Sequence, residues 1–182
     1  MADGVQLPAL IGVLVGAAAS YAVSALAERT RWQRQTAARW DERRLIAYAD
    51  YAQAIKAVVT LAHRLAAHRG LTPDATPLQP TEANLALLQD AEKQRSSLLE
   101  GVRLLTDSDT LTAIRALNHR VWHLVVLSAD EGASPQDWST AFSQYREARD
   151  EYHRHARHSL GIPGVALSHD QTWPPRWRRP AP

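Results

Sequence analysis

The sequence predicts an all-α protein in which an N-terminal transmembrane helix continues into a cytosolic up-and-down four-helix bundle. Three observations support this prediction. Residues 7–27 are apolar and uncharged, and four later segments repeat apolar residues at spacings of three and four. Proline, glycine and helix-capping residues separate those segments, which favours antiparallel helices joined by loops.

The composition indicates one folded domain. The 182 residues are 45% hydrophobic and 22% charged, as in ordinary globular proteins. The net charge of +2 is too small to predict nucleic-acid binding. The sequence has no cysteine, which excludes disulfides, thiolate metal ligands and cysteine nucleophiles.

Residues 7–27 are the predicted transmembrane helix, and residues 1–6 form a short flank before it. No charged residue occurs between Leu7 and Ala27, a length that matches the roughly 20 residues needed to cross a bilayer core. A cleaved export signal and a buried soluble helix are the alternatives. The first lacks positive charge before its apolar run, and the second needs more surrounding protein than this chain provides.

The basic residues beyond this helix predict its orientation. Arg29, Arg31 and Arg34 follow the apolar run, and Trp32 lies among them. Basic flanks remain in the cytoplasm, and an indole ring is suited to the headgroup layer. We therefore assign these four residues to the membrane interface. The prediction is a single-pass protein of the cell membrane, with lipid as a partner, its N-terminus outside and its bundle in the cytoplasm.

Small residues recur every four positions within the predicted span, at Gly12, Gly16, Ser20 and Ser24. On a helix they form one ridge, along which two transmembrane helices can approach closely. This predicts a homo-oligomer or a partner transmembrane helix. The alternative is that a span rich in alanine and glycine contains this spacing by chance.

The helix is expected to continue past the membrane, because no proline occurs between Pro8 and Pro73. Residues 28–44 are charged and predict a basic helical stalk. Residues 45–69 predict the first bundle helix. Its apolar stripe consists of Leu45, Tyr48, Ala52, Ile55, Val59, Ala62 and Ala66, with Tyr51, Val58 and Leu65 beside it.

Three further helices are predicted at residues 82–105, 109–129 and 135–160, which completes a bundle over residues 45–161. Thr81, the sequence "DSDT" at 107–110, and Ser134 with Pro135 and Asp137 provide their N-terminal caps. The apolar side of the first of these helices consists of Leu85, Leu88, Ala91, Leu98, Val102 and Leu105. Gly161 is expected to end the last helix.

Histidine is the only candidate for chemistry. His119 and His123 are four residues apart, which places two imidazoles on one helix face, as metal ligands require. This face lies opposite the apolar one, however, so the pair is expected to face solvent and is a weak metal candidate. No phosphate loop, nucleophile elbow or di-iron motif occurs. We therefore predict no cofactor and no catalytic residue, and an enzyme is the less favoured interpretation.

Residues 162–182 form a tail rich in proline, tryptophan and arginine. Its prolines prevent a helix. Trp173, Arg176, Trp177, Arg178 and Arg179 resemble membrane-active peptides in composition, in which indoles and cations contact anionic lipid. A disordered end is nevertheless the favoured interpretation, and contact with lipid or with a protein or nucleic acid is the alternative.

The stretch "RTRWQRQTAARWDERRLIAYADYAQAI", after an alanine-rich apolar segment and before a helical bundle, carries a resemblance. In this plan the chain resembles small uncharacterised single-pass membrane proteins of GC-rich actinobacteria, chiefly over residues 7–60. The resemblance implies membrane attachment and a cytosolic helical domain. It supplies no activity, ligand or functional residue.

Two classes of function follow. The first is a membrane-anchored interaction or scaffold module, which the span, the small-residue ridge, the stalk and the lack of chemical motifs support. The alternative is a metal-binding or catalytic bundle that uses its histidines. Metal analysis of the purified protein distinguishes the two.

Overall fold

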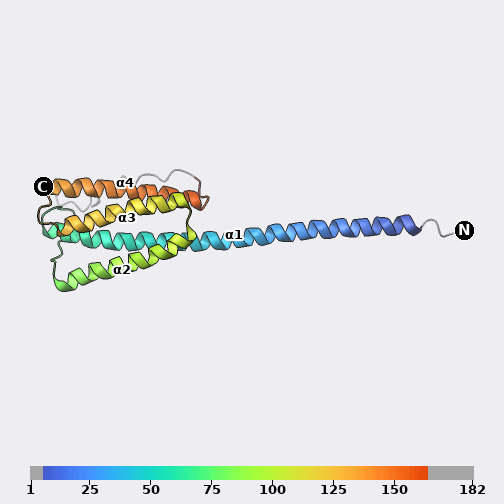
Figure 1. The fold of residues 1–182 in the computed structure, drawn as a ribbon, viewed down its shortest axis with the longest axis horizontal. Coiled ribbons are helices and arrows are strands. Elements are labelled where there is room, and N and C mark those ends of the chain that lie inside the picture. Colours follow the sequence, from blue (N-terminus) through green and yellow to red (C-terminus); the bar gives the residue numbers. More distant parts are fainter. Residues whose placement is uncertain (1–5, 164–182) are drawn as a thin grey trace, which may run out of the picture. The chain divides into compact units, whose positions relative to one another are not determined.

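The computed structural model describes residues 6–163, with side chains at Tyr21, Glu28, Arg31 and Trp32 and from Arg39 onward. Over this range the chain forms four α-helices and no strand. They are α1 (Gln6–His68), α2 (Glu82–Leu105), α3 (Ser108–Ala129) and α4 (Pro135–Ser159) (Figure 1). The prediction of an all-α protein with a four-helix bundle is confirmed. The predicted bounds of the last three helices differ from these by at most one residue.

Side-chain caps begin three of the helices. Thr81 and Asp107 each accept a hydrogen bond from the backbone N–H three residues ahead, at 3.3 and 2.8 Å. Before α4, Ser134 and Asp137 form the predicted capping box, with Pro135 in the first turn. These bonds satisfy N–H groups that have no partner within the helix. The local sequence therefore determines where these three helices begin.

Two glycines end α1 and α4. Gly70 and Gly161 have positive φ values of 75° and 65°, a conformation that favours glycine. In both cases the N–H of the residue after glycine bonds to the carbonyl five residues earlier, at 3.0 Å. This is the Schellman arrangement, which satisfies the last carbonyls of a helix. The predicted role of Gly161 is therefore confirmed.

The chain divides into two compact units, residues 1–42 and residues 43–182. Long-range hydrogen bonds give the direction of each helix in the second unit. The guanidinium of Arg44 donates to the carbonyl of Leu105 at 3.0 Å and to that of Ser159 at 3.5 Å, so α2 and α4 end beside the start of this unit. At the other end, Arg69 donates to the carbonyls of Leu127 and Ser128, where α3 ends. Consecutive helices of this unit are therefore antiparallel.

All four helices contribute to the core, but unequally. α1, α3 and α4 supply most of it, and the largest fully buried apolar side chains are Tyr51, Val58, Val102, Ile114, Leu117, Val121, Leu124 and Tyr152. In α2 only Leu88, Arg95 and Val102 are buried. α2 is therefore the helix least covered by its neighbours.

Two residues of the predicted stripes are exposed to solvent. Leu45 is 52% exposed and Leu85 is 40% exposed. Arg44, one position before Leu45, takes the inward place at the entry of the bundle because its guanidinium reaches two helix ends. Leu85 lies in the first turn of α2, ahead of the first buried residue of that helix.

Within the described residues, α1 is the one helix that is long and apolar enough to cross a membrane. The segment that meets this criterion is Arg39–His68, and it is partly buried. It contains the core residues Tyr51, Val58 and Ala62, so packing in the bundle accounts for its apolar character. The predicted span of residues 7–27 is helical, but its side chains except Tyr21 lie outside the described residues.

Candidate functional site

Most of the predicted membrane-contacting residues fall outside what the structure describes. Gly12, Gly16, Ser20 and Ser24, and with them Arg29 and Arg34, lie in α1, where their side chains are not described. Arg31 and Trp32 are described and exposed. The tail residues Trp173, Arg176, Trp177, Arg178 and Arg179 lie outside the described residues. The assignment of these residues to membrane contacts stays a prediction.

His119 and His123 are both exposed on α3, as the sequence predicts. They line an open surface depression of about 490 Å³ together with Trp122 and Val126. Three or more ligands are the usual requirement for a protein metal site. Among the described residues, no group of three histidine or acidic side chains is placed to hold an ion.

The most connected polar cluster lies inside the bundle and was not predicted. Arg95 of α2 is buried, and its guanidinium donates to the Glu92 carboxylate at 2.8 and 3.0 Å. It also donates to the side-chain oxygen of Asn118 on α3. The same oxygen accepts a hydrogen bond from the Tyr51 hydroxyl of α1 at 2.7 Å. Three helices thus meet at one buried charge.

Tyrosines extend this cluster to α4. The ring of Tyr152 packs edge-on against Tyr51 and Tyr48, with centroids 5.9 and 6.3 Å apart. The Tyr152 hydroxyl donates to the backbone carbonyl of Tyr48 at 2.9 Å. Burial raises the pKa of both Tyr51 and Tyr152, and for Tyr51 the neighbouring Arg95 only partly opposes this effect. Both hydroxyls therefore act as neutral hydrogen-bond donors.

This cluster is suited to fixing the packing of the helices rather than to catalysis. Tyr51 is fully buried and Arg95 nearly so, which leaves a substrate no route to them. A buried charge that loses its partners is strongly unfavourable, so the cluster disfavours other helix registers. The sequence nevertheless contains a signal for this cluster. Arg95 lies seven residues after Leu88 and seven before Val102, on the buried face of α2.

A second unpredicted residue is His63 of α1. Its ring packs against Phe142 and Trp138 of α4, with centroids 4.9 and 5.6 Å apart. Burial lowers the pKa of His63, and the charge of Asp74 opposes that effect. The spacing of His63 four residues after Val59 and three before Ala66 places it at the edge of the apolar stripe. The surroundings of this histidine favour the neutral imidazole.

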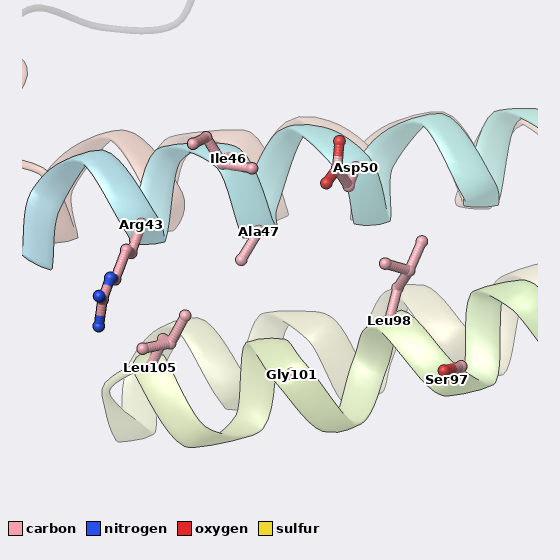
Figure 2. Close-up of a pocket in the computed structure, with 8 residues that line it drawn as sticks. All are labelled: Arg43, Ile46, Ala47, Asp50, Ser97, Leu98, Gly101 and Leu105. Carbon is pink, nitrogen blue, oxygen red and sulfur yellow. The ribbon is translucent and has the colours of Figure 1, made fainter.

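A groove between α1 and α2 is a candidate surface for contact with another molecule (Figure 2). Its volume is about 350 Å³. It is lined by Arg43, Ile46, Ala47, Asp50, Ser97, Leu98, Gly101 and Leu105, and we call it the α1–α2 groove. Arg43 and Leu105 lie at one end, and Asp50, Leu98 and Ser97 lie toward the other.

Large apolar side chains near the Leu105 end of this groove are exposed. Ile46, which lines the groove, is 53% exposed. Leu45 precedes it in α1, and Leu104 in the last turn of α2 is 87% exposed. Exposed apolar side chains are unremarkable when single, but a group of them beside a groove marks a contact surface.

Comparison of the chain with protein-family models, curated proteins and solved structures finds no match.

Proposed function

We propose that the protein is a single-pass, membrane-anchored helical bundle that acts as an interaction or scaffold module. In this proposal residues 7–27 cross the membrane and the bundle lies in the cytoplasm. The transmembrane helices associate along Gly12, Gly16, Ser20 and Ser24. The α1–α2 groove is the surface through which the bundle contacts a partner segment.

The groove is the observation that carries the interaction role. Its walls present Ile46, Leu98 and Leu105, and the exposed Leu45 and Leu104 are each next to a lining residue in the chain. Apolar side chains left in water favour association, because covering them removes apolar surface from solvent. The other polar clusters of the described residues are either buried within the bundle or lack a third metal ligand.

Continuity of α1 supports the membrane role. One helix, Gln6–His68, contains both the uncharged run and the first core residues of the bundle. Arginines follow that run directly, which favours retention of the bundle in the cytoplasm. The uncharged stretch at residues 7–27 is stable in lipid as a helix, because a helix satisfies its backbone hydrogen bonds internally.

Cell fractionation with a protease-accessibility assay tests this proposal. The full-length protein is expected in the membrane pellet after a high-salt wash, which removes proteins held by charge alone. A tag after Pro182 is expected to resist protease added to intact cells, and a tag before Met1 is expected to be cleaved. Recovery of the protein in the soluble fraction contradicts the anchor, and the reverse pattern of cleavage contradicts the orientation.

A further inference from the structure

We propose that the α1–α2 groove binds the chain's own C-terminal tail, residues 164–182. Trp173 is placed over Gly101, and the arginines that follow it are placed near Asp50. This inference rests on the interaction role proposed for the groove, but it does not depend on membrane anchoring. The tail then occupies the surface that a partner would otherwise contact.

Gly101 gives the groove room for a large side chain. A Cβ atom added at this glycine would meet no atom within 4 Å, so the space above it is open. Glycine weakens a helix, yet Gly101 lies in α2, four residues before its last residue Leu105. An indole ring combines a large apolar area with few rotatable bonds, which makes it an efficient anchor for such a space.

The tail begins close to the groove. Leu105 lines one end of the groove, and its carbonyl accepts a hydrogen bond from the Arg44 guanidinium. The carbonyl of Ser159, at the end of α4, accepts from the same guanidinium. Pro163 follows and remains near this helix end, because its carbonyl accepts a hydrogen bond from Arg157 at 3.1 Å. The chain therefore leaves α4 at the same end of the bundle as Leu105, the end at which the groove begins.

The length of the tail suits the length of the groove. Residues 164–172 extend to at most about 30 Å, whereas α2 rises only about 12 Å between Leu105 and Ser97. Trp173 can therefore reach Gly101 without strain. Pro174 and Pro175 follow it and favour an extended polyproline conformation, which loses little entropy on binding.

Charge indicates the direction in which the tail lies. Asp50 lines the groove away from the Leu105 end, and it is exposed. Within residues 39–163 no hydrogen bond or ion pair involves its carboxylate. Arg176, Arg178 and Arg179 come after Trp173 in the chain, so a tail that enters at Leu105 brings them toward Asp50. Arginine pairs readily with a carboxylate at such a rim.

The tail of the same chain is favoured over a second copy by its covalent link. A short flexible linker holds a segment at an effective concentration of the order of millimolar. A separate molecule reaches that concentration only in a crowded membrane. Lipid contact by the same tryptophans and arginines is the competing outcome that the experiment must distinguish.

Disulfide trapping in the full-length protein tests the inference. The chain has no cysteine, so Ser97→Cys with Pro175→Cys, two residues beyond the Trp173 anchor and toward Ser97, introduces a single reporter pair. The full-length protein is kept in a mild nonionic detergent without lipid, which suits it whether or not residues 7–27 cross a membrane, and the rate of disulfide formation under mild oxidant is measured. The matched variants add Gly101→Leu, which fills the groove, or Trp173→Ala with Trp177→Ala, which removes the anchors. The linker is the same in all of them.

We expect the reporter pair to form an intramolecular disulfide at least about tenfold faster than in either matched variant. Gly101→Ala, which leaves most of the space open, is expected to slow it much less than Gly101→Leu. Equal rates in all variants overturn the inference, as does a disulfide that links two chains. If the rate of disulfide formation falls on addition of anionic lipid but is unchanged by Gly101→Leu, the inference is also overturned, in favour of lipid contact. Membrane pelleting of the same variants reports separately on the proposed anchor.

Discussion

Two glutamate–arginine pairs on α2 share one spacing but differ in burial. Arg95 and Glu92 are 7% and 24% exposed, whereas Arg103 and Glu100 are 46% and 67% exposed. Removing one partner of a buried pair costs about 3 kcal/mol or more, while an exposed pair contributes less than about 1 kcal/mol. Position in the bundle, and not spacing, therefore determines what each arginine contributes.

We predict that Arg95→Met lowers the free energy of unfolding by about 3 kcal/mol, because Glu92 and Asn118 lose their partner. The matched change Arg103→Met is expected to cost less than about 1 kcal/mol. Chemical denaturation followed by circular dichroism measures both. Equal effects of the two substitutions would show that the buried cluster does not stabilise the fold.

His63 predicts a dependence of stability on pH. Burial among aromatic rings lowers its pKa below the ordinary value of 6.5, so the folded state binds a proton less readily than the unfolded chain. The neutral ring's contribution is therefore complete above pH 6.5. It decreases as the pH falls from 6.5 through the lowered pKa of the folded state.

His63→Phe keeps the aromatic packing but cannot bind a proton. We expect the variant to lose less stability than the original protein between pH 7.5 and pH 5. Thermal unfolding at both pH values gives the comparison. If the two proteins lose stability equally, titration of His63 does not contribute.

In contrast to the half-buried His63, His119 and His123 are both exposed on α3. Replacing both by alanine is expected to change stability by no more than about 0.5 kcal/mol. Metal analysis of the purified protein provides the second measurement. Zinc, iron or manganese bound near one equivalent, and lost in the double variant, would support the alternative of a metal-binding bundle.

At the scale of the element, the transmembrane helix carries a prediction about pairing. Gly16→Ile places a bulky side chain at the centre of the small-residue ridge while keeping the segment apolar. We expect helix association to fall clearly, and insertion to remain. Val15→Ile, on a different face, is the matched control. Equal signals in a transmembrane association reporter would assign any oligomer to the bundle instead.

The positions of the helices could be predicted from the sequence, whereas the contacts between them could not. Caps such as Thr81 and Ser134 act within three residues, so local sequence is enough to locate the helix starts. Arg95, in contrast, bonds to the side-chain oxygen of Asn118 on α3, which also accepts a hydrogen bond from Tyr51 on α1. Such partners are distant in sequence, and a pattern of apolar residues treats a charged residue as exposed. The α1–α2 groove was not predicted, because it forms where the packed faces of α1 and α2 leave neighbouring surface uncovered, and the sequence pattern does not specify how two helices pack.

At the scale of the whole molecule, the core lies entirely in the second compact unit. Among the described residues, every core side chain comes from Tyr48 or later in the sequence. We therefore predict that residues 28–182, without the predicted span, form a soluble helical domain that unfolds cooperatively. Circular dichroism and thermal unfolding test this. A second truncation that begins at Tyr51 also removes Arg44 and Tyr48, and it is expected to unfold at a lower temperature.

The contacts made by Arg44 and Tyr48 also determine when the bundle can close during synthesis. Their partners include the Ser159 carbonyl and the Tyr152 hydroxyl, which lie more than a hundred positions later in the chain. A ribosome extends the chain at about 5–20 residues per second, so these partners are synthesised several seconds after Arg44 and Tyr48. During that interval Tyr48 and Tyr51 stay open to solvent or to a chaperone. A ribosome that stalls before Tyr152 therefore holds a chain whose first helix is complete and whose core is not.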